Sequence, residues 1–417
     1  MSQTRVEIPM AGTPWPELRE EMLRRSEGDV KWRDGKAAVY IFHSGADVMA
    51  VAHEAYGMFI AENGLGPAAF PSLKRMESEV VQMALSLQNA PADAAGSMTS
   101  GGSESILLTI KACRDHARAH RGFDGVPEIV APYSVHPAFD KGAHLMGLNV
   151  VRVPCGDDFR ADVSAMAEAI TERTIMLVGS APCFPYGVID PIDALSDLAL
   201  ANDLWLHVDA CVGGYLTPFM RRVSAVEIEA YDFALPGVSS MSLDLHKYGY
   251  AAKGASTVLY RDATLRGHQI FDFDDWPCGQ MYTPTFAGTR PGGAIAAAWA
   301  VLNHLGQAGY ERQAQRITDA RDQLIAGVEG LGLRVFGAPK LSIVGFGSDN
   351  DDILAVGEGL YEGGWFSSRL KNPDGIQYMA SPEHCTTMPN YLKALEKYVG
   401  EVRSGARKRR AGQVSYS

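Results

Sequence analysis

The spacing of apolar residues divides the chain into three regions. In the first region, apolar positions recur every three or four residues, which is the period of an amphipathic helix. The predicted helices cover 16–25, 48–60 and 72–87, and a short extended run over 36–42 contains Tyr40. This region therefore predicts helices with one buried face, joined by one extended segment.

The middle region alternates short apolar strands with helices. The predicted strands cover 128–131, 150–153, 175–178 and 205–208. The predicted helices cover 103–119, 136–146, 162–170 and 192–201. Strands that are buried on both faces read as short apolar runs, so the pattern indicates an α/β fold with a mostly parallel sheet covered on both sides. Ligands of such sheets bind at the carboxyl ends of the strands.

The third region begins after Pro291. A long helical stretch over 294–331, interrupted near Gly306, precedes a smaller α+β pattern. A chain of 417 residues is too long for one compact core. We therefore expect an N-terminal segment (1–60), a large domain (61–300) and a small C-terminal α+β domain (301–417), which ends in a basic tail over 403–417.

Charge and cysteine content exclude some classes of protein. The formal net charge of −11 disfavours nucleic acid as a partner. The six cysteines are scattered, without a close pair that could form a zinc site, so we expect reduced thiols, a cytoplasmic location and no metal. The longest apolar run, 294–302, is shorter than the roughly 20 residues that cross a bilayer, so no transmembrane segment is expected.

A lysine and an aspartate are the main candidates for chemistry. Lys247 follows a small and apolar stretch over 238–241 and is flanked by tyrosine and glycine, which predicts a buried amine with a lowered pKa. Asp209 ends the apolar strand 205–208, at the ligand edge of the sheet. Taken singly, a lysine is usually a solvated charge and such an aspartate can be a helix cap. Together they meet the needs of pyridoxal 5′-phosphate (PLP), which requires an amine for its Schiff base and a carboxylate for its pyridine nitrogen.

Two further motifs fit the same cofactor. The run Thr99–Ser105 contains Gly102 and Ser103 before a predicted helix, where backbone N–H groups and the helix dipole favour a phosphate. His136 lies in a turn, from which its ring could stack on the pyridine ring. Alone, the glycine turn is an ordinary helix start and the histidine is more often structural. Their order along the chain, before Asp209 and Lys247, makes them candidates.

These elements, in this order, resemble the sphingosine-1-phosphate lyase family in its soluble bacterial type, a branch of the group II PLP-dependent decarboxylases. The stretches that carry the resemblance are 98–106, 127–132, 136–141, 187–191, 207–214, 246–254 and 287–293. The resemblance extends from about Trp32 to Tyr391. It implies PLP fold type I (aspartate aminotransferase-like), with a seven-stranded type of sheet, and a homodimer that shares its active sites.

The resemblance also implies roles for individual residues. Lys247 carries the Schiff base, Asp209 pairs with the pyridinium and His136 stacks on the ring. The residues assigned to the cofactor phosphate and its surroundings are Gly102, Ser103, His246 and, reaching across the dimer, Thr289 and Gly292. Tyr40 and Lys253 match positions that bind the substrate phosphate or assist catalysis.

The implied reaction is a retro-aldol cleavage. A phosphorylated 2-amino-3-hydroxy long-chain base would yield a long-chain aldehyde and phosphoethanolamine, with Lys247 or Tyr40 as the base. Two positions depart from the family pattern, since Gly66 and Tyr186 replace histidines near the expected substrate position. An amino-acid α-decarboxylase of the same superfamily is the main alternative. Another PLP reaction, such as transamination, and a non-catalytic PLP-binding protein remain open.

Overall fold

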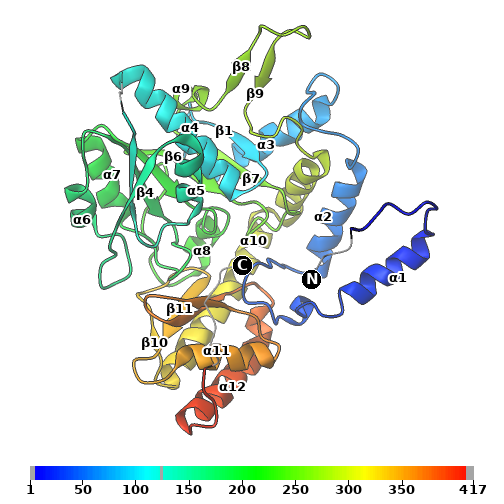
Figure 1. Cartoon of the computed structure of the whole chain (residues 1–417), viewed down its shortest axis with the longest axis vertical. Coiled ribbons are helices and arrows are strands. Elements are labelled where there is room, and N and C mark those ends of the chain that lie inside the picture. Colours follow the sequence, from blue (N-terminus) through cyan, green and yellow to red (C-terminus); the bar gives the residue numbers. More distant parts are fainter. Residues whose placement is uncertain (1–4, 123–124, 410–417) are drawn as a thin grey trace.

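A seven-stranded sheet forms the centre of the computed structural model, which describes residues 5–122 and 125–409 (Figure 1). In spatial order, its strands are β1 (Ala95–Thr99), β7 (Ser256–Tyr260), β6 (Val238–Leu243), β5 (Trp205–Asp209), β4 (Thr174–Ser180), β2 (Glu128–Pro132) and β3 (Asn149–Val153). Within the described residues, β7 runs in the direction opposite to the other six strands. The predicted mostly parallel sheet is therefore confirmed.

Helices cover both faces of this sheet. The helices of the large sheet region are α4 (Gly102–Arg121), α5 (Ala138–Met146), α6 (Val163–Glu168), α7 (Ile192–Ala201), α8 (Thr217–Val223) and α9 (Ala263–Gly267). Successive residues of β2 point to opposite faces, so Ile129 joins the core under α4 and α5 while Val130 joins the core that contains residues of α7 and α8. This alternation gives three layers, as the continuous apolar strands predict.

The long helix α10 (Gly292–Gly330) leads from the sheet to the C-terminal part. It is kinked at Gly306, whose φ of 54° is accessible to glycine, and this confirms the predicted interruption. A four-stranded antiparallel sheet follows, in the order β10 (Arg334–Val335), β11 (Ile343–Gly347), β13 (Gly375–Met379) and β12 (Ser368–Leu370), with α11 (Ile353–Glu362) and α12 (His384–Arg403). Helix α10 crosses the boundary drawn at residue 300, and the division into domains stays a prediction. Of the predicted tail, 410–417 lies outside the described residues.

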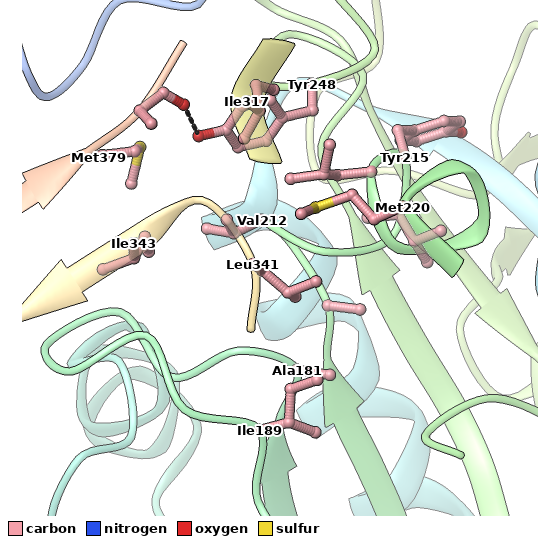
Figure 2. Packing of buried hydrophobic residues seen from close by; sticks show 14 of the residues in the cluster. Ala181, Ile189, Val212, Tyr215, Met220, Tyr248, Ile317, Leu341, Ile343 and Met379 are labelled. Atoms are coloured by element: carbon pink, nitrogen blue, oxygen red, sulfur yellow. Dashed lines mark hydrogen bonds between the residues drawn. The ribbon is translucent and has the colours of Figure 1, made fainter. Parts of the chain in front are cut away.

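The small sheet shares its core with the large one. Figure 2 shows Val212 and Met220 of the large region beside Leu341 and Ile343 of the small one. In the same place the hydroxyl of Tyr248 donates to the carbonyl of Ala380 over 2.7 Å. The residue next to Lys247 is thus anchored to the end of the small sheet.

The N-terminal helices precede the large sheet, and two of them, α2 (Ala46–Met58) and α3 (Pro71–Leu87), pack against α10 (Figure 1). The others are α1 (Trp15–Arg25) and the 3₁₀ turn η1 (Trp32–Asp34). Every residue of α1 is at least partly exposed, and the hairpin of β8 (Phe271–Phe273) and β9 (Met281–Thr283) projects from the molecule. Among the described residues, no helix combines the length and the apolar character that a bilayer crossing needs.

Candidate active site

A cavity of about 430 Å³ lies at the carboxyl ends of the parallel strands. Strand β5 ends at Asp209, β6 ends shortly before Lys247, and β2 ends shortly before His136. Six of the predicted site residues line this cavity: Gly102, Ser103, His136, Asp209, His246 and Lys247. The parallel sheet therefore brings together side chains that are far apart in the sequence, at the edge where such sheets bind ligands.

Lys247 forms an ion pair with a carboxylate that the sequence analysis did not single out. Its Nζ lies 2.9 Å from Oδ2 of Asp244, three residues earlier. Burial lowers the pKa of Lys247, but the carboxylates, Asp244 foremost, more than offset this effect and hold the pKa above its ordinary value. The predicted lowering of the Lys247 pKa is therefore wrong. Asp244 is visible in the sequence three residues before Lys247, but the turn that brings its carboxylate to the amine is not.

Asp209 is held at the end of β5 by two donors. Its Oδ1 accepts from the amide of Cys211 over 3.1 Å and from the hydroxyl of Ser242 over 3.2 Å. The Ser242 hydroxyl also lies 3.2 Å from Nε2 of His207. Burial lowers the pKa of His207 to about 4, so this ring is neutral at pH 7. Two neighbouring strands thus fix the orientation of the Asp209 carboxylate at the cavity wall.

The N-terminus of α4 lines another part of the cavity. Its N-cap is Gly101, which has no side chain to occupy the amides of the first turn. A Cβ at Gly102 would approach Sγ of Cys211 to 2.6 Å and Oδ2 of Asp244 to 2.9 Å, so only glycine fits. These free amides at the positive end of a helix suit a phosphate.

His136 presents a neutral ring to the cavity. Its Nδ1 accepts from the amide of Ala138 over 3.1 Å, which fixes the orientation of the ring. Burial lowers the pKa of His136 below its ordinary value. A neutral and oriented imidazole offers a flat face to an aromatic ligand.

Tyr40 and Lys253 line an adjoining cavity of about 320 Å³, together with His136, His246 and Lys247. The Nζ of Lys253 donates to the carbonyls of Tyr40 and His246, over 3.1 and 3.3 Å. Burial, and next the positive charge of Lys247, lower the pKa of Lys253 to about 8. The structure thus places a second amine beside Lys247, with a charge that titrates near neutral pH.

The extended run that contains Tyr40 is held by the small sheet region. The amide of Ala38 donates to the carbonyl of Phe366 over 2.7 Å, and the amide of Met379 donates to the carbonyl of Ala38 over 2.7 Å. Tyr40 then takes a positive φ of 66°. The N-terminal segment and the C-terminal sheet together position the Tyr40 side chain at the cavity.

A third cavity, of about 450 Å³, shares Phe42 and Lys253 with the adjoining cavity. The side chains that α2 gives to its wall are mostly apolar: Val48, Met49, Ala52, His53 and Tyr56. The helical pattern over 48–60 predicts the helix but not that it lines a cavity. The region around Lys253 therefore joins a polar cavity to a largely apolar one.

Thr289 and Gly292 are not among the described residues that line the cavity around Lys247. Their segment instead pairs with the loop after α2, where Asn63 bridges to Pro291 and the guanidinium of Arg290 donates to the carbonyl of Gly64 over 3.1 Å.

The two positions that depart from the family pattern lie in two different parts of the molecule. Gly66 belongs to the loop that pairs with the segment around Pro291. Tyr186 is buried, and its hydroxyl donates to the carbonyl of Asn372 over 2.9 Å. Neither residue is among the described residues that line the cavity around Lys247.

The residues of the cavity fit PLP. One cavity is lined by an amine, an oriented carboxylate, a flat imidazole and a helix N-terminus at which only glycine fits. One oxygen of the buried Asp244 has no hydrogen-bond partner among the described residues, as in a site shaped for a ligand with donors. The fold and this cavity define an α/β enzyme that uses PLP.

Comparison with known proteins supports this class. The family model described as the pyridoxal-dependent decarboxylase conserved domain matches residues 1–335. The mouse sphingosine-1-phosphate lyase 1 is 38% identical over 408 residues, which are 97% of this chain and 72% of the mouse protein. The solved structure of the sphingosine-1-phosphate lyase of Burkholderia pseudomallei is 37% identical, with a TM-score of 0.92 over 97% of this chain and 94% of that one.

The chain belongs to the sphingosine-1-phosphate lyase family, within the PLP-dependent decarboxylases. The glutamate decarboxylase of Lactobacillus brevis, at 19% identity and a TM-score of 0.82 over 96% of each chain, shares the fold alone. The predicted family, fold type and cofactor are confirmed.

Proposed function

We propose that the protein is a PLP-dependent carbon–carbon lyase that cleaves a phosphorylated 2-amino-3-hydroxy long-chain base into a long-chain aldehyde and phosphoethanolamine. The observation that carries this proposal is the position of Lys253, between the polar cavities around Lys247 and the apolar cavity under α2. A substrate with a phosphate at one end and an alkyl chain at the other matches a site with a cation next to an apolar volume. The names of the relatives agree with it.

We propose that the predicted residues hold the cofactor as follows. Lys247 would bind its aldehyde carbon, Asp209 its ring nitrogen and His136 one face of the ring. The amides of Gly102 and Ser103 would bind its phosphate, with His246 nearby. When bound, PLP supplies an electron sink for the electron pair that the broken carbon–carbon bond leaves on the substrate.

The chain itself binds the substrate and moves its protons. The Lys253 ammonium pairs with the substrate phosphate through charge-assisted hydrogen bonds. The proton of the C3 hydroxyl passes to the neutral amine of Lys247, once the substrate amine has replaced it on the cofactor, or to the deprotonated oxygen of Tyr40, while the C2–C3 bond breaks. The protonated base then returns a proton to C2. Asp244, 2.9 Å from Lys247, keeps this amine in reach and stabilises its protonated form.

The test is identification of the products by mass spectrometry. The PLP-loaded protein is incubated with a phosphorylated long-chain base, with the same base lacking the phosphate, and with a set of amino acids. We expect phosphoethanolamine and a fatty aldehyde from the first substrate alone. Carbon dioxide and an amine from an amino acid would overturn the proposal in favour of the α-decarboxylase alternative.

We further propose a homodimer in which the segment with Thr289 and Gly292 completes the partner's site. Its support is that this segment and the loop with Gly66 pair with each other, and that neither Thr289 nor Gly292 lines the cavity around the Lys247 of their own chain. Exposed apolar side chains on α1 and around the β8–β9 hairpin, such as Trp15, Phe271 and Trp276, also suit a surface that a partner covers.

Mixed dimers test this arrangement. Lys247→Ala removes the amine, and Thr289→Glu places a carboxylate against a phosphate, so each homodimer should lose activity. Co-expression of the two chains should restore activity, because a mixed dimer then has one site with intact Lys247 and an intact partner segment. Mixed dimers that stay inactive, or a monomer in sedimentation analysis, would contradict the proposal.

A reducing, cytoplasmic location is also proposed. Its support is that each of the six cysteines is a free thiol, and three of them, Cys113, Cys183 and Cys211, are buried. Free thiols persist where glutathione keeps them reduced.

A further inference from the structure

Three histidines lie close together near the C-terminal end of α4, whereas the N-terminal end of this helix lines the cavity around Lys247. His116 and His120 belong to α4, and His268 directly follows α9. One ligand atom from each of the three rings lies within 4.8 Å of the other two. His116 and His268 are half-buried, and His120 is exposed. From Gly102 to His116 the helix rises by about 21 Å, so this cluster is separate from the cavity around Lys247.

The two helical histidines share one face because they are four residues apart. Their rings stack with centroids 4.1 Å apart, and the ring of His268 stands edge-on to them at 5.2 and 5.7 Å. The Nδ1 of His120 lies 2.9 Å from the carbonyl of His116. A carbonyl can only accept, so Nδ1 carries the proton and Nε2 keeps its lone pair. A hydrogen bond of this kind fixes the tautomer and orientation of metal-binding histidines.

His268 is attached to α4 through its backbone, which leaves its ring for a ligand. The Nζ of Lys111 donates to the carbonyls of His268 and Ile270, over 2.7 and 3.3 Å. The same Nζ forms an ion pair with Asp115 at 3.1 Å, and the guanidinium of Arg114 pairs with the same carboxylate at 2.9 Å. On the inner side, the ring of Trp205 stands edge-on to His116 with centroids 5.8 Å apart and closes the site.

We propose that His116, His120 and His268 bind a divalent transition metal of the zinc class. Imidazole nitrogens suit Zn²⁺, Cu²⁺ and Ni²⁺, and three protein ligands leave a fourth tetrahedral position for water on the exposed side of His120. Metal–nitrogen distances of about 2.0–2.1 Å require the three nitrogens to come closer than they lie here. On metal binding, side-chain rotations would bring the three nitrogens together, while Nδ1 of His120 keeps its hydrogen bond to the carbonyl of His116.

The metal would join α4 to the base of the β8–β9 hairpin. His268 lies three residues before the start of β8 at Phe271, and the hairpin leads to the segment around Thr289. A ligand that binds only the folded arrangement stabilises it by mass action. The metal would therefore stabilise the folded protein at the hairpin base, whatever reaction the distant cavity catalyses.

The test is a titration of the PLP-loaded, full-length protein with ZnCl₂ after chelator treatment. Calorimetry should give one high-affinity Zn²⁺ per chain, and the metal should raise the Tm. His120→Gln changes an exposed side chain and should weaken Zn²⁺ binding by at least about tenfold, because one of three ligands is lost. His268→Gln should do the same. The matched control is His144→Gln, an exposed histidine on α5, which should bind Zn²⁺ as the parent does.

Cobalt gives a second readout that distinguishes this site from stray thiol or surface binding. Co²⁺ bound by three histidines and water should show the visible absorption of tetrahedral Co²⁺ in a difference spectrum of the parent against His120→Gln. Equal Zn²⁺ affinity in the parent, His120→Gln and His268→Gln would overturn the proposal. Absence of stoichiometric binding in the parent would overturn it as well.

Discussion

The cavity around Lys247 and the apolar cavity under α2 have similar volumes, about 430 and 450 Å³. Their walls differ in chemistry, since many charged and polar side chains line the first and mostly apolar side chains line the second. The first is bounded by loops that follow parallel strands, and its side chains hold one another through hydrogen bonds and ion pairs. The second is bounded by one face of α2 and by the N-terminal segment. The small cavity with Tyr40 and Lys253 shares residues with both.

This difference separates chemistry from substrate selection. Oriented polar groups act on the reacting atoms, so changes among them should lower kcat for every substrate. An apolar wall contributes through the area that it buries, so changes there should alter kcat/KM according to the length of the alkyl chain. The predictions that follow test this separation, from the largest expected effect to the smallest.

Removal of the amine should have the largest effect. Lys247→Ala should lower turnover by at least about 10³-fold for every substrate, because the group that binds the cofactor is lost. The visible absorption band of the bound cofactor should disappear. The control is Lys141→Ala, an exposed lysine on α5, which should retain activity and the band. Full activity of Lys247→Ala would refute the role of this cavity.

Neutralising the carboxylate at the end of β5 should separate cofactor binding from catalysis. Asp209→Asn should keep the visible band of the cofactor but reduce kcat by about 10²-fold or more, since a fixed charge next to the ring is lost. Absorption spectra and steady-state kinetics on the same preparation measure both effects. An unchanged kcat would remove Asp209 from its proposed role.

Lys253 should affect binding of the phosphate, and in a pH-dependent manner. Lys253→Gln should raise KM for the phosphorylated substrate by roughly 10–150-fold, the equivalent of one charge-assisted hydrogen bond of about 1.5–3 kcal/mol. The pKa of Lys253 is lowered to about 8, so its charge is present below that pH and is lost as the pH rises through it. KM of the parent should therefore increase above about pH 8.

An arginine at this position gives the matched control. Lys253→Arg keeps its charge at every pH of the assay, so KM should lose its rise above pH 8. A KM that rises equally in both proteins would assign the pH effect to another group.

Bulk in the apolar cavity should have the smallest and most selective effect. Ala52 lies on the face of α2 that lines this cavity, and Ala52→Phe should reduce kcat/KM for a long-chain substrate by about tenfold, because each displaced CH₂ costs about 0.8 kcal/mol. A short-chain analogue should react as with the parent. Ala50→Phe, on the exposed face of the same helix, is the control. Equal losses for both chain lengths would show that the cavity does not hold the alkyl chain.

The sequence predicts best where a single local pattern determines the structure. The apolar run before Asp209 predicts both β5 and the position of the carboxylate. In contrast, β6 has the sequence Val-Ser-Ser-Met-Ser-Leu, and its small hydroxylated residues resemble a loop although the strand is almost fully buried. The hydrophobic pattern therefore does not predict β6 as a strand, and it does not predict β1 or β7 either.

Contacts that depend on tertiary folding were not predictable. The pairing of Asp244 with Lys247 depends on a turn, and it reverses the expected direction of the lysine pKa. His268 meets His116 and His120 only because α9 packs against α4. The prediction that no metal is bound was based on the spacing of the cysteines alone, whereas the proposed ligands are histidines from two separate segments.

The most direct test of the proposed lyase is the reaction of a phosphorylated long-chain base in heavy water. The return of a solvent proton to C2 predicts phosphoethanolamine that carries one deuterium on carbon, together with one equivalent of fatty aldehyde, and neither product with Lys247→Ala. Carbon dioxide release from an amino acid, without cleavage of the phosphorylated base, would contradict the account.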